Sequence, residues 1–229
     1  MRLVAEHFNI LRFDTRGQGL SDSPAGVYDL EAHTQDLEQV ISEQAIDKFF
    51  LLGLSNGART ALEFTRRHPH CVLGLVACDT FDKVGPLLRL KIESWLKANT
   101  IGGPYHRFDV AMPWIWGETI LSQHPEIIEY YRNRANLMEL RVVESLIRGT
   151  LIGEIDVSQI ETPTLFLVGD EDLLTPKSYH ESMAAKMKNA AVVEVSGGHA
   201  SLLEYPASFV SDVLPFLKKL ISQEFSYVG

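Results

Sequence analysis

The 229-residue chain contains only two cysteines, Cys71 and Cys78, and both flank an apolar run. Cysteines in such surroundings are typical of core side chains, and two of them do not supply the disulfide framework that small secreted domains need. The first residues include neither a long apolar segment nor a small-residue cleavage site, so no secretory signal and no membrane span is predicted. This pattern favours a cytoplasmic protein in a reducing compartment.

Positive charge is also scarce, because 30 Asp and Glu outnumber 21 Lys and Arg and give a formal net charge of -9. A net negative charge repels phosphate backbones, and no Lys/Arg stripe with interleaved aromatics appears, so nucleic acid is not an expected partner. The sequence has no H-E-x-x-H motif and no Cys/His ligand spacing, so no metal site is predicted. Residues 16–19 lack the third glycine of a dinucleotide site, and we therefore expect no cofactor.

Short β-rich runs alternate with helical patterns along much of the chain. Four of the five runs are near-continuous apolar stretches, which suits strands buried on both faces of a parallel sheet. The runs span residues 8–13, 48–54, 72–78, 164–168 and 191–195. Helices are predicted at residues 30–44, 57–67, 87–98, 125–134, 137–148 and 206–220. This order predicts an α/β fold with a doubly wound, mainly parallel sheet.

The β signal stops between the third and fourth runs, where helical patterns and Gly/Pro breaks replace it. We therefore predict an α/β core formed by residues 1–80 and 160–229, with a helical lid inserted at residues 81–159. Two interpretations of Trp114 and Trp116 in this lid stay open: they line an acyl pocket, or they pack the lid against itself.

The segment Gly53-Leu54-Ser55-Asn56-Gly57 has the pattern G-x-S-x-G, and it lies where a predicted buried strand ends and a helix begins. A sharp strand-to-helix turn needs small neighbours, because the serine backbone is strained and its hydroxyl must stand clear of the sheet. This context favours Ser55 as a nucleophile over the simpler interpretation of a small residue at a tight turn.

A serine hydroxyl becomes a strong nucleophile only when a base removes its proton and a third group holds that base. Two later loops supply such groups, since residues 169–176 follow the fourth run and Gly198-His199 follow the fifth. Both loops begin at the carboxyl ends of strands, where the ligand sites of open α/β sheets gather. We predict His199 as the base. The residues alone leave its acidic partner open among Asp170, Glu171, Asp172 and, just past the third run, Asp79.

These motifs resemble those of the α/β-hydrolase superfamily, in particular its lidded serine esterases and lactonases. The resemblance is carried by residues 12–22, the turn around Ser55, residues 169–176 and residues 198–206. It implies that Asp172, three residues after Gly169, orients His199, and that the backbone N–H of Asn56 binds the oxyanion. The lid and the Gly-Gly-His-Ala loop are similar to those of 3-oxoadipate enol-lactonases and aminoacrylate hydrolases.

The resemblance implies a serine hydrolase that cleaves an ester, lactone or related acyl bond of a small molecule. Cleavage of a carbon–carbon bond in a diketone, or perhydrolysis, would use the same residues. Such hydrolases usually begin with three further strands and a His-Gly loop that donates a second oxyanion N–H, whereas no His-Gly dipeptide precedes Ser55. The alternative is therefore a truncated, catalytically impaired or ligand-binding homologue. A missing strand would also leave a sheet edge open, which favours a homodimer.

Overall fold

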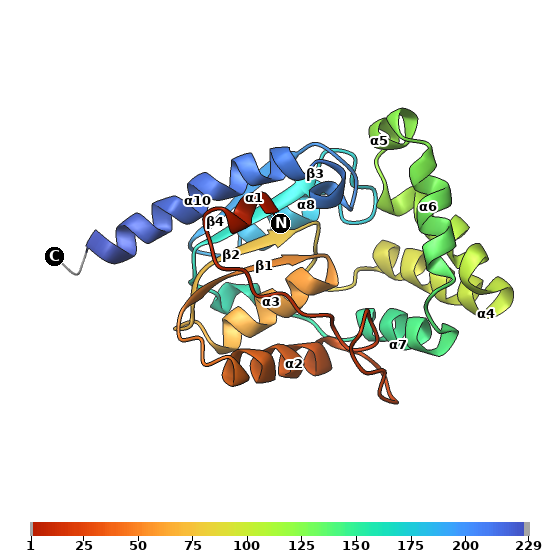
Figure 1. Cartoon of the computed structure of the whole chain (residues 1–229), viewed down its shortest axis with the longest axis horizontal. Helices are drawn as coiled ribbons and strands as arrows, with labels where there is room; N and C mark the ends of the chain where they lie inside the picture. Colours follow the sequence, from red (N-terminus) through yellow and green to blue (C-terminus); the bar gives the residue numbers. More distant parts are fainter. Residues whose placement is uncertain (1, 227–229) are drawn as a thin grey trace.

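The computed structural model describes the backbone of residues 2–226 and the side chains of residues 4–223. Within this part of the chain, one four-stranded sheet has the order β1-β2-β3-β4, and each neighbouring pair is parallel. Its strands are β1 (Phe49–Leu54), β2 (Val72–Cys78), β3 (Thr164–Gly169) and β4 (Ala190–Val195). Helices lie on both sides of the sheet (Figure 1). The predicted α/β fold class is confirmed.

The helices follow the predicted alternation, with further short elements between them. They are α1 (Arg2–Ala5), α2 (Leu30–Glu43), α3 (Asn56–Arg67), α4 (Pro86–Ile115), α5 (Glu118–Gln123), α6 (Glu126–Ala135), α7 (Leu140–Thr150), η1 (Val157–Gln159), α8 (Lys177–Ala184), α9 (Ser201–Glu204) and α10 (Pro206–Ser226). Each of the six predicted helices corresponds to one of these, although α4 continues well beyond the predicted residue 98. The helices α5 and α8 were not predicted.

Successive residues of the inner strands pack on opposite faces of the sheet, which is why these strands need continuous apolar runs. Phe166 of β3 packs with Leu62 of α3 and Met183 of α8 on one face. Leu167, the next residue, packs with Val213 of α10 on the other face. All six residues of β3 are buried. The sheet therefore has two hydrophobic cores, and its strand ends are held in fixed places.

The prediction of a strand at residues 8–13 is wrong. Phe8 packs its ring edge-on against Phe50 of β1, with ring centroids 5.8 Å apart, but Ile10 and Leu11 are exposed. No backbone hydrogen bond joins residues 9–13 to β1 within the described residues. A β-rich run becomes a strand only where it exchanges backbone hydrogen bonds with a neighbouring strand, and in residues 2–226 β1 pairs with β2 alone. The homodimer that an open edge favours stays a prediction.

The buried Arg59 of α3 fixes the end of α7 against the start of α3. Its guanidinium donates hydrogen bonds to the carbonyl oxygens of Thr150 and Gly153, at 3.0 and 2.7 Å, and lies 4.6 Å from the centroid of the Phe81 ring. The last carbonyls of a helix have no partner within the helix, so a cation at this end stabilises it. Burial lowers the pKa of Arg59 to about 10. The segment before β3 is thereby held beside the turn that carries Ser55.

Helices α4 to α7 all come between β2 and β3 and gather beside the sheet in Figure 1, as the green elements. We call residues 81–159 the helical insertion; its use as a lid and these boundaries stay predictions. Its longest helix, α4, is interrupted at Gly103, which has φ 68° and ψ -158° and precedes Pro104. A glycine accepts this conformation readily, and the proline restricts it further, so the predicted break is present.

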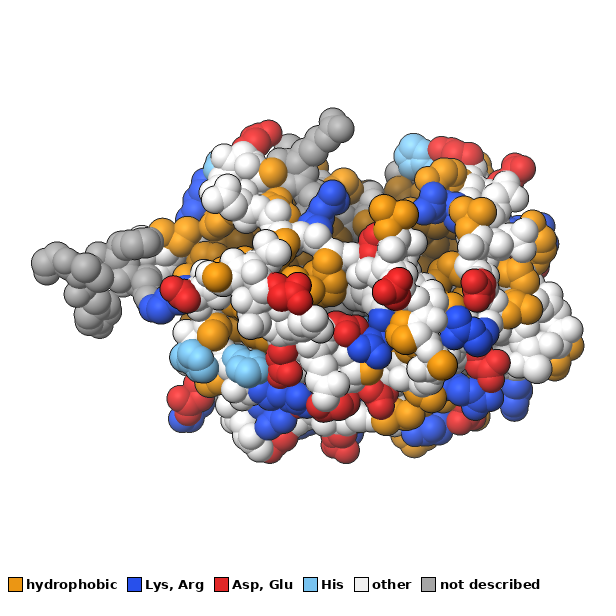
Figure 2. Space-filling model, turned by 60° about the horizontal axis from the view of Figure 1, so that its bottom comes forward, with side chains coloured by type: hydrophobic (Ala, Val, Ile, Leu, Met, Phe, Trp, Pro, Cys, Tyr) orange, Lys and Arg blue, Asp and Glu red, His pale blue; other side chains and the backbone are white. Residues whose placement is uncertain are grey.

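The surface charges, the helices and the two cysteines relate to the expectations about partners, membrane spans and disulfides. Acidic and basic side chains are interspersed over the face in Figure 2. In residues 2–226 no helix has both the length and the apolar character needed to cross a membrane. Both cysteines are free; Cys78 is buried as expected, whereas Cys71 is only half-buried, at the loop before β2. The cytoplasmic location itself stays a prediction.

Candidate active site

Ser55 stands in a sharp turn between β1 and α3. Its φ of 53° and ψ of -119° are strained for a residue with a side chain, and such strain is found mostly at functional sites. The turn is close-packed, because a Cβ atom on Gly53 would lie 2.4 Å from the carbonyl oxygen of Gly57 and 2.5 Å from the nitrogen of Ala58. Only a glycine fits at position 53, which explains the first glycine of the G-x-S-x-G pattern.

Three predicted site residues, each from a different loop, are brought into one hydrogen-bonded chain. The Oγ of Ser55 lies 2.8 Å from Nε2 of His199, and Nδ1 of the same ring lies 3.0 Å from Oδ2 of Asp172. His199 follows β4 and Asp172 follows β3, so parallel strands bring these side chains to the same edge of the sheet. His199 and Asp172 are both buried, at 5% and 4% exposure, while Ser55 is half-buried.

The loop around Asp172 is folded to hold its carboxylate. Oδ1 accepts hydrogen bonds from the backbone N–H groups of Leu174 and Thr175, each at 2.8 Å. Oδ2 accepts one from the Thr175 hydroxyl at 2.8 Å, and Thr175 Oγ1 also lies 3.1 Å from Nδ1 of His199. Hydrogen bonds within its own loop thus hold the Asp172 carboxylate in place, independently of its contact with the imidazole. Thr175 was missed in the sequence, although its place three residues after the aspartate is a local signal.

The other carboxylates that were candidates for the acid have different partners. Asp170 accepts a hydrogen bond from the backbone N–H of Gly197, and Glu171 accepts from the backbone and hydroxyl of Thr119. Asp79 is fully buried and binds other groups, described below. Of the four candidates, Asp172 is the one with a hydrogen bond to His199.

Burial and charge act in opposite directions on this pair. Burial alone would lower the pKa of His199, but the hydrogen bond and negative charge of Asp172, together with the negative charges of Asp79 and Glu204, outweigh it, so the pKa of His199 lies above its ordinary value. Burial would raise the pKa of Asp172, yet its hydrogen bonds with His199 and Thr175 hold that pKa below its ordinary value. Asp172 is therefore ionised over the range in which His199 gains and loses a proton.

The backbone N–H of Asn56 lies in the first turn of α3, directly after Ser55. N–H groups in the first turn of a helix have no acceptor within the helix, and the helix dipole favours negative charge there. The Asn56 side chain points elsewhere, because its Nδ2 donates a hydrogen bond of 2.6 Å to Thr150 Oγ1 of α7. The backbone N–H is therefore the Asn56 group placed to interact with negative charge beside Ser55, and its role as an oxyanion donor stays a prediction.

The two predicted pocket tryptophans lie in different surroundings. Trp114 is part of an apolar cluster that includes Leu174, from the loop that carries Asp172, and Lys91 lies 4.5 Å from the centroid of the Trp114 ring. Trp116 packs against Tyr131 of α6, with ring centroids 4.7 Å apart and the rings tilted by 44°. Neither is hydrogen-bonded to Ser55, His199 or Asp172, and a role in substrate binding stays a prediction for both.

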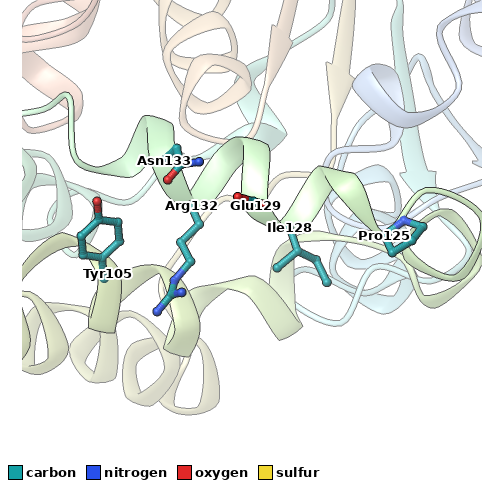
Figure 3. A pocket seen from close by; sticks show the side chains of 6 residues that line it. All are labelled: Tyr105, Pro125, Ile128, Glu129, Arg132 and Asn133. Carbon is teal, nitrogen blue, oxygen red and sulfur yellow. The ribbon is translucent and has the colours of Figure 1, made fainter.

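A separate groove of about 660 Å³ crosses the helical insertion between α4 and α6 (Figure 3). Its lining residues are Tyr105, Pro125, Ile128, Glu129, Arg132 and Asn133. None of the predicted site residues lines it. Among the described residues, no group of three or more His, Cys, Asp or Glu side chains is arranged to hold a metal ion.

Known proteins match this chain over most of its length. A family model described as serine aminopeptidase, S33 matches residues 1–204. A protein of Yersinia enterocolitica named "Putative carbamate hydrolase RutD" is 26% identical over 225 residues, covering 93% of this chain and 79% of the relative.

Solved structures of α/β-hydrolases have the same fold. An enol-lactonase from Burkholderia xenovorans superposes with a TM-score of 0.86 at 24% identity, over 95% of this chain and 84% of the lactonase. A thermophilic esterase from Thermogutta terrifontis gives a TM-score of 0.81 at 26% identity, over 90% of this chain and 78% of the esterase. The expected resemblance to the superfamily is confirmed, and the chain belongs to the serine aminopeptidase S33 family of α/β-hydrolases.

Proposed function

We propose that this α/β-hydrolase is a serine hydrolase that cleaves an ester, lactone or related acyl bond of a small molecule. The observation that carries the proposal is the hydrogen-bonded chain from Ser55 Oγ through His199 to Asp172, with contacts of 2.8 and 3.0 Å. A nucleophile within reach of a base, and a base held by a buried carboxylate, is the arrangement that acyl transfer through serine needs.

In the first half-reaction, Ser55 Oγ attacks the carbonyl carbon of the substrate while His199 Nε2 takes the hydroxyl proton. Asp172 holds the ring by its Nδ1–H and stabilises the imidazolium that forms. The N–H of Asn56 donates a hydrogen bond to the carbonyl oxygen as it becomes negative. His199 then returns the proton to the leaving oxygen, and an acyl-enzyme remains.

In the second half-reaction, a water molecule attacks the acyl group. His199 takes the proton of this water and returns it to Ser55 Oγ, so the enzyme is regenerated and the acid is released. Two relatives support an acyl substrate, since the Thermogutta protein is an esterase and the Yersinia protein has the name "Putative carbamate hydrolase RutD". Esters, lactones and carbamates all present a carbonyl carbon to the same nucleophile.

Contacts between the helical insertion and the loop of His199 support a role of the insertion as a cover for this site. The backbone N–H of Ala200, next to His199, donates a hydrogen bond of 3.2 Å to the carbonyl oxygen of Ile115 at the end of α4. A buried carboxylate, Glu204, accepts hydrogen bonds from the N–H groups of Gly198 and Gly117, at 3.0 and 3.4 Å. The end of α4 therefore rests on the histidine loop, and we infer that Trp114 borders the space for the acyl group.

A second candidate function is ligand binding without efficient turnover. It is favoured by the oxyanion site, where the described residues offer the N–H of Asn56 and residues 1–54 contain no His-Gly dipeptide. Loss of one oxyanion donor lowers kcat by about 10²- to 10³-fold in enzymes of this kind. A slow enzyme and a binding protein then differ in whether an acyl-enzyme forms.

A burst experiment separates these two functions. When the chain is mixed with p-nitrophenyl acetate, we expect rapid release of about one equivalent of p-nitrophenol per chain, followed by slower steady release. The burst arises because Ser55 is acylated faster than the acyl group is hydrolysed. Stopped-flow absorbance measures it, and mass spectrometry of the quenched protein should show an acetyl group on Ser55. Binding of the ester without burst, acetylation or turnover would favour the second function.

The pH dependence of kcat/KM tests the base. His199 accepts a proton only in its neutral form, and its pKa lies above the ordinary value of 6.5. We therefore expect kcat/KM to rise with pH through an apparent pKa above that value, and to be lost at lower pH as the imidazole becomes protonated. Measurement between about pH 5 and pH 9 covers this titration. A rate that is constant over the whole range would contradict a histidine base.

A further inference from the structure

Asp79 is a fully buried carboxylate that the proposed reaction does not use. It is the first residue after β2, and its φ of 46° is in the left-handed region that residues with a side chain rarely adopt. Its exposure is 0%. A buried charge and a strained backbone both destabilise the folded chain, so compensating contacts must hold this side chain in place.

The two carboxylate oxygens of Asp79 bind two different loops. Oδ1 accepts a hydrogen bond of 2.9 Å from the backbone N–H of Gly169, where β3 ends and the loop to Asp172 begins. Oδ2 accepts one of 2.6 Å from the hydroxyl of Ser201, two residues after His199. One side chain therefore joins the loop of the acid to the loop of the base.

The next residue extends this connection to the turn of the nucleophile. The hydroxyl of Thr80 donates a hydrogen bond of 2.9 Å to the carbonyl oxygen of Ser55. The backbone N–H of Thr80 is fixed in turn by Nε2 of the buried His180, at 2.8 Å. The two residues after β2 thus contact all three loops that carry Ser55, Asp172 and His199.

We propose that Asp79 is a positioning residue that holds the loops of Asp172 and His199 in the register that the hydrogen bond to Ser55 requires. This inference rests on the proposed function of Ser55 and His199. Asp79 itself makes no hydrogen bond to the imidazole, which is bound by Asp172. It acts through Gly169 and Ser201, so its replacement should change the reactivity of Ser55 more than substrate binding.

The negative charge of Asp79 has a second effect, which depends on the titratable groups near it. The titratable side chains that interact with it are Asp172 from the loop after β3, His199 from the loop after β4, and Cys78 on its own strand. His180 of α8 is bound to the backbone N–H of the next residue, Thr80, and Glu204 of α9 also acts on His199. Burial raises the pKa of Asp79 to about 7, and its negative charge contributes to the raised pKa of His199.

The raised pKa of Asp79 determines how its contribution to the stability of the folded chain depends on pH. Because the pKa of Asp79 is higher in the folded than in the unfolded chain, its contribution to stability is fully present below the ordinary value of 3.8 and is lost as pH rises through about 7. At pH 8 the ionised carboxylate is therefore a destabilising group. A side chain that served stability alone would be better replaced by its neutral amide.

The test compares Asp79→Asn, Ser201→Ala and the wild-type chain at about pH 8, above the pKa of Asp79. Asparagine keeps the shape and can still accept from Gly169 N–H, but it removes the charge. Ser201→Ala removes one hydrogen bond and keeps the charge. A matched control is Asp82→Asn, which alters a carboxylate of the same segment that is paired with Lys186 at 2.7 Å. The readouts are the rate at which a fluorophosphonate labels Ser55, kcat and KM for p-nitrophenyl acetate, and the melting temperature. In addition, kcat/KM is measured for each variant between about pH 5 and pH 9.

For Asp79→Asn we expect labelling and kcat to fall by about 10- to 100-fold, with KM changed less than about twofold, because small displacements of reacting groups have effects of this size. Its melting temperature at pH 8 should be equal to or above that of the wild type. The acid limb of kcat/KM should move to lower pH, since the imidazolium loses a stabilising charge. Ser201→Ala should slow labelling without moving that limb, and Asp82→Asn should match the wild type.

Several results would overturn the inference. An Asp79→Asn chain that is labelled at the wild-type rate would do so, as would one whose lower rate merely accompanies a lower melting temperature. If Asp79→Asn does not fold, Ser201→Ala decides, and wild-type labelling of that variant would reject the positioning role. If the wild-type chain is not labelled at all, the serine hydrolase proposal fails and the inference falls with it, whereas normal wild-type labelling with an unaffected Asp79→Asn rejects the inference alone.

Discussion

Replacing Ser55 by alanine should lower kcat by a factor on the order of 10⁵ or more, because the variant has no hydroxyl to form the acyl-enzyme. It should also abolish labelling by a fluorophosphonate probe, while the His199 to Asp172 contact stays in place. The measurement is steady-state hydrolysis of p-nitrophenyl acetate together with gel fluorescence of the labelled protein. The melting temperature should change little, since only one half-buried oxygen is removed.

A matched control for this experiment is Ser122→Ala, which removes an exposed hydroxyl on α5. It should keep both labelling and kcat. If the Ser55→Ala variant is still labelled, another side chain is the nucleophile and the proposed reaction is wrong.

Replacing Asp172 by asparagine should lower kcat by about 10⁴-fold, because an amide at this position leaves the imidazole in the wrong tautomer and unstabilised when protonated. Asp170→Asn should have a far smaller effect. The Asp170 carboxylate binds the N–H of Gly197, and an amide oxygen can accept the same hydrogen bond. Each variant replaces one carboxylate of the same loop by an amide, so the ratio of their kcat values shows how much the effect depends on which of the two carboxylates is changed.

Circular dichroism of both variants should accompany these assays, because Asp172 accepts three hydrogen bonds from its own loop and its replacement also affects local order. Equal losses in the two variants would mean that the loop as a whole, and no single carboxylate, supports His199. A larger loss in Asp170→Asn would transfer the orienting role to Asp170.

All four strands that the structure describes could be located from the sequence, because each contains a near-continuous apolar run, although only the inner strands β2 and β3 are buried on both faces of the sheet. Residues 72–78, for example, were predicted as a strand and form β2 without a shift of either end. Residues 8–13 are also rich in Phe, Ile and Leu, with Asn9 and Arg12 between them, yet Leu11 and Phe13 are exposed and no strand forms there. Composition reports how well a segment suits a strand, while a neighbouring edge decides whether it becomes one, and one sequence does not reveal that edge.

The candidate site divides in the same way. Ser55 and His199 lie at the ends of strands with a recognisable pattern, so local sequence was enough to select them. The choice of Asp172 among neighbouring acids depended on a resemblance, because the hydrogen bonds from Leu174 and Thr175 that fix its carboxylate are a property of the folded loop. Three of the four hydrogen bonds of Asp79 and Thr80 join residues 90 or more positions apart, and no periodic pattern in the sequence indicates them.

Helices were missed where proline or shortness weakened the pattern. The second part of α4 begins at Pro104, directly after the break at Gly103, and it also contains Pro113, a residue type that usually marks a helix boundary but is accommodated here. Helix α8 has only eight residues and follows Pro176, so its apolar positions are too few to define a period.

The position of α4 has an optical consequence. The chain contains three tryptophans, and Trp95 and Trp114 lie within α4 while Trp116 directly follows it. The four strands of the sheet contain none. Tryptophan fluorescence of the unmodified protein is therefore emitted by the helical insertion alone, whereas far-UV circular dichroism reports on every helix and strand. In a denaturant titration, the two signals will coincide if the insertion and the sheet unfold together, and they will separate if the insertion unfolds as an independent unit.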